Sequence, residues 1–326
     1  MVVLAIGVTP DTVLAKEAGL ELGIKESIVV NDRMETSVPD IYAAGDAVQV
    51  KHYVTGNDAL ISLAGPANKQ GRIIADNICG GDSRYLGSQG SSVIKVFDMT
   101  AATTGINETN AKKSGLEVDT VILSPMSHAG YYPGGKVMTM KVVFEKETYR
   151  LLGAQIIGYE GVDKRIDVLA TAIHAGLKAT QLKDLDLAYA PPYSSAKDPV
   201  NMAGFMIDNI AKGTLKQWHL EDMDKISRDK SVVLLDVRTV GEFNRGHMDG
   251  FKNIPVDELR ERINEIEKGK PVYLICQSGL RSYIASRILE GNGYETYNFS
   301  GGFRFYDAVV NDRALIERAY ACGMDY

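Results

Sequence analysis

One cysteine in the last third of the chain has surroundings suited to nucleophilic chemistry. Cys276 follows the apolar run 271–275, which predicts a buried strand, and precedes the segment 282–289, which has helical spacing. Backbone N–H groups of the turn, the start of the helix and the charge of Arg281 would all favour a thiolate over a thiol. The predicted substrate-binding loop consists of Gln277, Ser278, Gly279 and Leu280. The sequence therefore predicts a nucleophile, Cys276, with Arg281 as its catalytic partner, at a strand-to-helix turn.

Four further landmarks surround this loop in a fixed order. They are the runs Leu234–Arg238, Glu242–His247, Asn253–Pro255 and Asn298–Phe303. Together with the loop they resemble a rhodanese domain that covers residues 217–326, and the resemblance implies that Cys276 carries a sulfane sulfur as a persulfide. Four residues separate Cys276 from Arg281, as in sulfur-carrying rhodaneses, whereas related phosphatase-like loops have five. Sulfur is therefore favoured over phosphate as the transferred element.

Structural roles are also considered for residues of this segment. Cys276 could be a buried structural thiol, because free cysteine is among the most buried residue types. The turn, the arginine and the surrounding landmarks favour the functional interpretation. The charged landmark residues are expected to form an ion-pair and hydrogen-bond scaffold under the loop, without a chemical role of their own. They are Asp236, Arg238, Glu242 and His247.

The composition is that of an ordinary globular protein. The 326 residues suffice for two or three domains, and the net charge of −6 argues against a nucleic-acid partner. Three cysteines without a CxxC pair exclude a disulfide framework and a structural zinc site, and they fit a reducing cytoplasmic location. The apolar run 1–8 is too short for a membrane span and has the wrong flanks for a signal peptide. No metal-ligand cluster is expected among the five histidines.

The N-terminal segment contains a strand-turn-helix pattern. A buried strand is expected over residues 2–8 and a short helix over 11–18, followed by a short strand that ends at Gly45-Asp46. Helical spacing then extends from Ser62 to Ile78. This pattern resembles the second half of the FAD-binding domain in the pyridine nucleotide-disulfide oxidoreductases. The resemblance implies cofactor-binding roles for Gly45 and Asp46 in the turn and for Leu63 and Ala64 at the start of the helix.

In that family the equivalent of Asp46 accepts a hydrogen bond from the ribityl chain of the flavin, and the helix N-terminus faces the ring. Both roles are physically apt, although Asp46 could instead be a simple turn residue. No GxGxxG motif occurs in the sequence, so no glycine turn is available for a pyrophosphate. Cys79 does not match the context of the family's redox cysteine and is expected to be structural. The resemblance thus implies the C-terminal portion of a longer FAD- and NAD(P)H-dependent enzyme.

Residues 91–213 are expected to form an α+β unit. Strands are predicted at 93–97, 120–123, 136–145 and 149–157, with a hairpin turn at Glu147-Thr148, and helices at 161–175 and 199–211. The unit resembles the dimerisation domain of the same flavoenzyme family, which implies a homodimer.

Two tyrosine-containing stretches in this unit narrow the resemblance. They are His128–Gly134 and Leu187–Pro199. In coenzyme A-disulfide reductases a pair of tyrosines that reaches across the dimer interface helps to protonate and position the coenzyme A thiol. Tyr131 and Tyr189 are the best matches, with the neighbouring Tyr132 and Tyr193 left open. Interfacial packing is an equally good explanation for any one of these tyrosines.

The whole chain resembles a coenzyme A-disulfide or persulfide reductase fused to a rhodanese. The expected fold is multidomain: a partial FAD/NAD(P)-binding Rossmann-like domain (residues 1–88), an α+β dimerisation domain (89–213) and an α/β rhodanese domain (217–326). The expected substrates are small thiols, coenzyme A species and sulfane sulfur. Sulfur transfer through Cys276 is the activity expected of this chain by itself. The alternative is a non-catalytic dimeric scaffold. The sequence does not distinguish coenzyme A disulfide, persulfide and polysulfide as acceptors, or NADH from NADPH.

Overall fold

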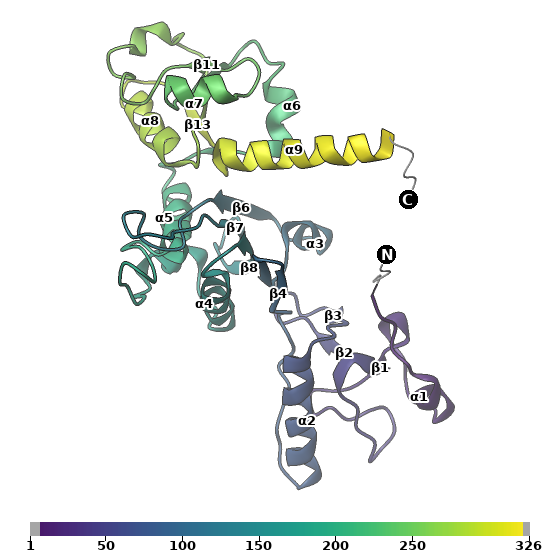
Figure 1. Cartoon of the computed structure of the whole chain (residues 1–326). Coiled ribbons are helices and arrows are strands. Elements are labelled where there is room, and N and C mark those ends of the chain that lie inside the picture. The colour runs from purple at the N-terminus through teal and green to yellow at the C-terminus, as the bar shows by residue number, and fades with distance from the viewer. Residues whose placement is uncertain (1–6, 322–326) are drawn as a thin grey trace.

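The computed structural model describes residues 7–321, with side chains for residues 7–312. The strand expected over residues 2–8 lies mostly outside the described residues, and so does Cys322. We refer to residues 7–88, 89–213 and 217–321 as the N-terminal, middle and C-terminal domains. They follow one another along the molecule, and each contains its own sheet (Figure 1).

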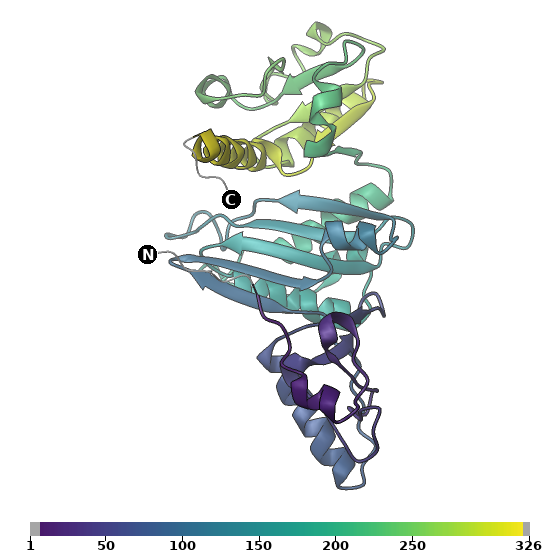
Figure 2. The ribbon, with the colours of Figure 1, turned by 90° about the vertical axis from the view of Figure 1, so that its right-hand side faces the viewer.

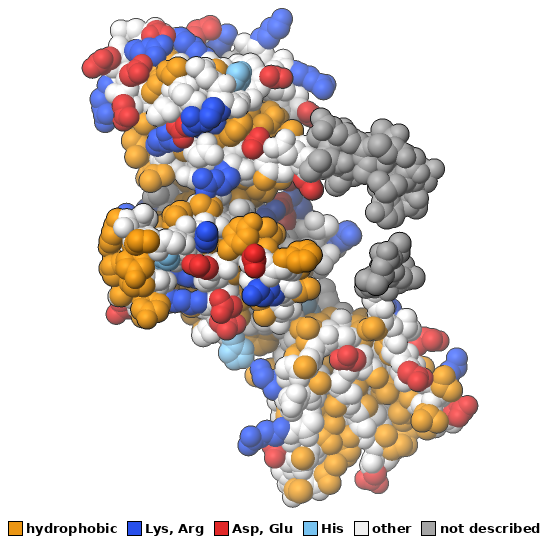
Figure 3. All heavy atoms as spheres, in the orientation of Figure 1, with side chains coloured by type: hydrophobic (Ala, Val, Ile, Leu, Met, Phe, Trp, Pro, Cys, Tyr) orange, Lys and Arg blue, Asp and Glu red, His pale blue; other side chains and the backbone are white. Residues whose placement is uncertain are grey.

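The N-terminal domain has a small three-stranded sheet. Its strands are β1 (Ile28–Val29), β2 (Val48–Lys51) and β3 (Asp58–Ala59), and its helices are α1 (Val13–Glu17) and α2 (Ala64–Ile78), with 3₁₀ turns η1 (Ile24–Glu26) and η2 (Gly45–Ala47). The prediction of a strand before Gly45 is wrong, because only an isolated bridge between Glu35 and Tyr42 forms there. An apolar run forms a ladder only when a partner strand lies alongside it. Hydrophobic side chains cover much of this domain's surface in Figure 3, and its buried cluster consists of Met34, Val48 and Val50.

The middle domain is an antiparallel sheet whose two longer helices lie on one face (Figure 2). Its strands are β4 (Ser92–Val96), β5 (Met99–Gly105), β6 (Val118–Leu123), β7 (Thr139–Glu145) and β8 (Leu151–Gly158), in the order β4-β5-β8-β7-β6. Its helices are α3 (Glu108–Lys113), α4 (Val162–His174), η3 (Ala179–Asp184) and α5 (Pro199–Ala211). The predicted strands and helices are found, whereas β5, α3 and η3 had no counterpart in the prediction. Helix α4 packs on β5 and β8 and closes the main hydrophobic core.

The C-terminal domain is a parallel five-stranded sheet in the order β11-β10-β12-β13-β9. The strands are β9 (Gln217–Trp218), β10 (Val233–Asp236), β11 (Lys252–Asn253), β12 (Val272–Ile275) and β13 (Thr296–Phe299). The helices are η4 (Leu220–Asp222), α6 (Met223–Ile226), α7 (Val240–Arg245), η5 (Ile263–Glu265), α8 (Leu280–Glu290) and α9 (Gly302–Ala321). Two separate buried clusters flank this sheet, as expected where helices cover both faces of a parallel sheet. The predicted fold class is thus confirmed.

Polar contacts join the C-terminal domain to strand β6 of the middle sheet. Gln217 Nε2 donates to Thr120 O at 3.3 Å, and Ile122 N donates to Ser300 Oγ at 3.1 Å. His219 Nε2 lies 3.1 Å from Asp119 Oδ1. Because β6 is an edge strand, these contacts satisfy backbone groups that its own sheet leaves unpaired. Among residues 7–321 no helix is long and apolar enough to cross a membrane.

Candidate active site

Cys276 lies directly after β12 and is buried, with 1% of its surface exposed. The apolar residues of β12 form this central strand, and α8 begins four residues after the cysteine. Gly279 caps α8 with a φ of +100°, a conformation that glycine adopts without strain. The predicted strand-turn-helix setting of the loop is therefore found. Gln277 and Ser278 are half-buried, Gly279 is buried and Leu280 is exposed.

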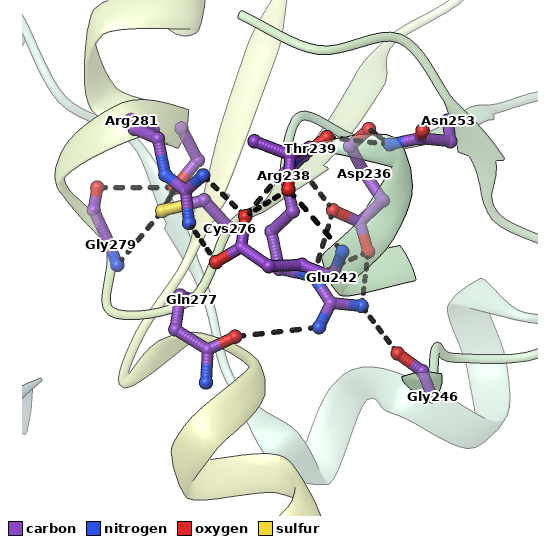
Figure 4. Close-up of polar contacts among 11 residues, drawn as sticks. Asp236, Arg238, Thr239, Glu242, Gly246, Asn253, Cys276, Gln277, Gly279 and Arg281 are labelled. Atoms are coloured by element: carbon purple, nitrogen blue, oxygen red, sulfur yellow. Dashed lines mark hydrogen bonds and ion pairs between the residues drawn. The ribbon is translucent and has the colours of Figure 1, made fainter. Parts of the chain in front are cut away.

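Two hydrogen-bond donors converge on the sulfur. Gly279 N donates to Cys276 Sγ at 3.1 Å (Figure 4). Ser282 Oγ donates to the same sulfur at 3.2 Å. The sequence predicted a set of backbone N–H groups, whereas the second donor in the described structure is the hydroxyl of Ser282. Ser282 was missed because a serine in the first turn of a helix is ordinary in a sequence. Both donors would stabilise negative charge on the sulfur.

Arg281 forms a two-pronged ion pair with Glu242. Its Nη1 and Nη2 each lie 2.7 Å from one carboxylate oxygen of Glu242. Hydrogen bonding to Arg281 lowers the pKa of Glu242 from 4.5 to about 2, and the same contact raises the pKa of Arg281. The charge that Arg281 brings to the loop is therefore largely balanced by Glu242, and the pair fixes the guanidinium beside the cysteine loop (Figure 4).

A second, buried ion pair supports the loop from below. Arg238 Nη2 lies 2.7 Å from Asp236 Oδ2, and Arg238 also donates to Gly246 O at 2.8 Å and to Gln277 Oε1 at 3.4 Å. The guanidinium carbon of Arg238 lies 3.8 Å from the ring centre of Phe303. These contacts fit the scaffold expected of Asp236, Arg238 and Glu242. His247 instead stacks on Phe243 and is exposed.

Two further residues support the loop although no role was predicted for them. Asn298 Nδ2 donates to Gly279 O at 3.2 Å from the neighbouring strand β13. Gly302, with a φ of +68°, lies so close that a Cβ would be 2.6 Å from Ser278 N. Both belong to the landmark run Asn298–Phe303, so their position was visible in the sequence but their function was not.

A pocket of about 410 Å³ opens beside the loop. Its lining residues are Arg238, Glu242, Arg245, Gly246, Gln277, Phe303, Arg304 and Asp307. Arginine side chains on this wall would attract an anionic sulfur donor toward Gln277. Gln277 is the residue of the cysteine loop that lines this pocket.

The two predicted tyrosines meet in the middle domain. Tyr131 Oη and Tyr189 Oη are 2.8 Å apart, within hydrogen-bond distance, although 58 residues separate them. This hydrogen bond raises the pKa of Tyr189. Tyr132 instead packs edge-on against His128, and Tyr193 lines a pocket of about 500 Å³ beside Tyr189. The geometry therefore separates the pair Tyr131 and Tyr189 from the two alternatives.

These tyrosines lie on an apolar surface. Figure 3 shows hydrophobic side chains gathered at the left edge of the middle domain, over the loops beside α5. The exposed tyrosines of these loops are Tyr131, Tyr132, Tyr189 and Tyr193. Large aromatic side chains exposed together mark a surface suited to a ligand or a partner chain.

The predicted cofactor residues come together in the N-terminal domain. Turn η2, with Gly45 and Asp46, packs on the first turns of α2, and Gly45 N donates to Gln70 Oε1 at 2.7 Å. Leu63 caps α2 without a side-chain hydrogen bond and Ala64 begins the helix, so the first N–H groups are open to a ligand. Asp46 and Ala64 are exposed. The residues present fit the ribityl and ring end of FAD, but the sequence offers no glycine turn for its pyrophosphate.

Cys79 and the remaining candidates add no further chemistry. Cys79 is exposed at the end of α2. Within residues 7–321 no group of three or more histidine, cysteine or acidic side chains is arranged to hold a metal ion.

Three family models match successive parts of the chain. Residues 1–71 match the pyridine nucleotide-disulphide oxidoreductases, residues 91–199 match the dimerisation domain of that family, and residues 219–308 match the rhodanese-like domain. The matched segments lie in the N-terminal, middle and C-terminal domains respectively.

Solved structures and curated proteins give the same result. The reduced CoADR-RHD of Bacillus anthracis is 48% identical with a TM-score of 0.93, over 96% of this chain and 56% of that one. A NAD-dependent persulfide reductase from A. fulgidus is 42% identical with a TM-score of 0.85, over 93% and 55%. The coenzyme A disulfide reductase of Staphylococcus aureus is 35% identical over 206 residues, 63% of this chain and 47% of that protein. The chain thus spans about half the length of the curated relatives it matches.

Proposed function

Because the chain belongs to the pyridine nucleotide-disulphide oxidoreductases, as the C-terminal part of a coenzyme A-disulfide or persulfide reductase with a fused rhodanese domain, we propose that it handles sulfane sulfur. The complete protein would reduce coenzyme A disulfide, coenzyme A persulfide or polysulfide. The C-terminal domain would transfer sulfur through Cys276. The observation that carries this proposal is the convergence of two donors on the sulfur of Cys276.

The sulfur step needs no oxidant or reductant. The Cys276 thiolate attacks the outer sulfur of a persulfide donor, the donor's S–S bond breaks, and the donor leaves as a thiolate. Cys276 then carries a persulfide, whose charge Gly279 N–H and the Ser282 hydroxyl stabilise. An acceptor thiolate attacks the terminal sulfur and regenerates Cys276. Fusion to a thiol reductase would raise the local concentration of the sulfur carrier.

The tyrosine pair would act on coenzyme A. Tyr131 and Tyr189 share one hydrogen bond, so one phenol keeps a proton that it can donate to a leaving coenzyme A thiolate. Bound FAD and NAD(P)H would supply the electrons for disulfide reduction, with Gly45, Asp46, Leu63 and Ala64 holding the flavin. Without a glycine turn for the pyrophosphates, we expect this chain alone not to oxidise NAD(P)H.

The experiment is a sulfur-loading assay read by mass spectrometry. We expect the chain treated with a persulfide donor to gain about 32 Da on Cys276, the mass of one sulfur atom. Cys276→Ser should show no adduct, and Cys79→Ser should load normally because Cys79 lies in another domain. Equal loading of the Cys276→Ser variant would refute the proposal and leave the scaffold alternative.

We also infer a homodimer formed through the middle domain. Four of the five β4 residues are exposed, and Phe97 at the hairpin tip is 93% exposed. An edge strand that exposes apolar side chains on both faces is suited to cover by a second copy. Sedimentation of Ile94→Asp should give a smaller species than the original chain, whereas Leu86→Asp, in the N-terminal domain, should not.

A further inference from the structure

We propose that Arg165 is a positioning residue that holds Tyr131 and Tyr189 in contact by fixing the two loops that carry them. Arg165 comes from α4 and touches neither tyrosine ring. The proposal deepens the function given above, since the importance of the tyrosine pair rests on it.

The guanidinium of Arg165 lies inside the domain between both loops. Arg165 is 1% exposed, and it pairs with the buried Asp198 at 2.9 Å between Nη2 and Oδ2. The same Nη2 lies 3.0 Å from Ser127 O in the first loop and 3.3 Å from Tyr193 O in the second. One charged group therefore bridges the backbone of the two tyrosine loops.

Other contacts complete this junction. Ser194 Oγ donates to Asp198 Oδ2 at 2.7 Å, and Ala129 N donates to Ser194 O at 3.0 Å. Arg165 Nη1 donates to Gly161 O at 3.2 Å. A Cβ on Gly161 would lie 2.1 Å from that nitrogen, so the glycine leaves the space that the guanidinium fills.

Packing of the tyrosine rings cannot by itself hold Tyr131 and Tyr189 in contact. Tyr131 is 77% exposed and Tyr189 is 46% exposed, so little packing holds either ring. The 2.8 Å contact between the two hydroxyl groups must then depend on how the loops that carry the tyrosines are held. A buried ion pair contributes little to stability, because proteins with apolar residues in its place are often as stable. Its directed hydrogen bonds do fix the geometry of the groups that it joins. The Arg165 network has the position and the geometry for that role.

The test measures ionisation of Tyr189 in the full chain by NMR of ¹³C-labelled tyrosine rings, with the resonance identified by its loss in Tyr189→Phe. Removing the partner in Tyr131→Phe should lower the pKa of Tyr189, since Tyr131 is the main cause of its increase. We expect Arg165→Lys to lower it in the same way while Tyr131 is still present. Lysine keeps the charge beside Asp198 but loses the separate hydrogen bonds of Nε to Asp198 and of Nη1 to Gly161 O, which orient the guanidinium between the loops.

A purely structural role would change stability but not this titration in the folded state. The matched control is Arg150→Lys, because Arg150 is half-exposed and donates to Val54 O outside the loops. It should leave the Tyr189 titration unchanged. A folded Arg165→Lys variant that titrates like the original chain would overturn the proposal.

Ser194→Ala provides the test if Arg165→Lys does not fold. It removes the hydroxyl between Arg165 and Asp198 without leaving a buried charge unpaired. We expect a smaller decrease in the Tyr189 pKa, and no change in the folded variant would again overturn the proposal. Coenzyme A binding is measured in parallel. If Tyr131→Phe binds coenzyme A normally while the titration depends on Arg165, the coenzyme A role fails and the positioning role stands.

Discussion

At the residue scale, Cys276 combines burial with polar contacts at its sulfur. A purely structural thiol would be surrounded by apolar atoms, whereas Cys276 Sγ accepts hydrogen bonds from Gly279 N and Ser282 Oγ. These donors gain strength when the sulfur becomes negative, because hydrogen bonds to charged acceptors are stronger than those to neutral ones. The sulfur of Cys276 therefore has the polar partners that a persulfide-carrying cysteine needs.

The Ser282 hydroxyl can be tested by its removal. Ser282→Ala should slow sulfur loading of Cys276 about tenfold, the effect of losing about 1.4 kcal/mol from a hydrogen bond to a charged acceptor. The rate of mass gain with a persulfide donor measures this. Ser286→Ala, one turn further along α8 and bonded only to Tyr283 O, is the control and should load normally. Equal rates in all three proteins would show that the hydroxyl does not support the reactive sulfur.

Glu242 gives a prediction for acid stability. Arg281 lowers the pKa of Glu242 to about 2 in the folded chain, while 4.5 is its ordinary value. Between these two pH values the unfolded chain binds the proton and the folded chain does not, so stability falls as pH falls. The contribution is fully present above the ordinary pKa. Glu242→Gln should be less stable at neutral pH and should approach the original chain as pH falls toward about 2.

The measurement is denaturant unfolding followed by fluorescence, since the only tryptophan is Trp218 in the C-terminal domain. Glu258→Gln, at an ion pair with Arg262 away from the loop, controls for the loss of a carboxylate elsewhere in the domain. A constant stability difference between Glu242→Gln and the original chain over the whole pH range would contradict the prediction.

At the scale of elements, the cysteine loop is held in place by a close backbone approach. Gly302, at the start of α9, contacts Gln277 and Ser278, and a Cβ there would lie 2.6 Å from Ser278 N. We expect Gly302→Ala to displace the loop and to reduce sulfur loading by at least about tenfold, while the domain stays folded. Gly293→Ala is the control, because Gly293 also has a positive φ but no neighbouring atom within 4 Å. If both variants lose loading equally, backbone strain rather than loop displacement is the cause.

The elements predicted correctly are those whose signal lies in consecutive residues of the sequence. The cysteine loop was predicted because the strand, cysteine, arginine and helix follow one another, and α5 was predicted because residues 199–211 have helical spacing. Strand β5 was missed because its small and hydroxyl side chains, Thr and Ala, show little apolar pattern. Its formation depends on pairing with β4 and β8. Arg165 was missed for a related reason, since a charged residue on an amphipathic helix normally faces solvent.

At the scale of the whole molecule, the sulfur-handling domain is docked on the edge of the middle sheet. Strand β6 offers Thr120 O and Ile122 N, and the C-terminal domain meets them with Gln217 and Ser300. The charged contact at this junction is that of His219 with Asp119. The orientation of the cysteine loop relative to the tyrosine pair therefore depends on a junction that contains a titratable group.

Burial alone would lower the pKa of His219, but the hydrogen bond and charge of Asp119, together with Glu221 and Asp222, raise it above 6.5. Burial would raise the pKa of Asp119, yet contact with His219, with help from Lys146, lowers it, so Asp119 stays ionised near neutral pH. A histidine with a raised folded-state pKa stabilises docking below its ordinary pKa and loses that effect as pH rises through the raised value. Docking should therefore weaken as pH rises above the ordinary pKa of histidine.

The measurement is hydrogen exchange of the Ile122 amide, which donates to Ser300 Oγ across the junction. Its protection, corrected for intrinsic exchange, should fall about fivefold between about pH 5.5 and about pH 8.5, as expected from loss of an ion pair worth about 1 kcal/mol. His219→Gln keeps a donor for Asp119 but does not titrate, so its protection should be independent of pH. The amide of Ile156, in the buried strand β8 that β7 separates from β6, should stay protected throughout. If protection of the Ile122 amide in the original chain does not depend on pH, the backbone contacts of β6 hold the domains together without the histidine.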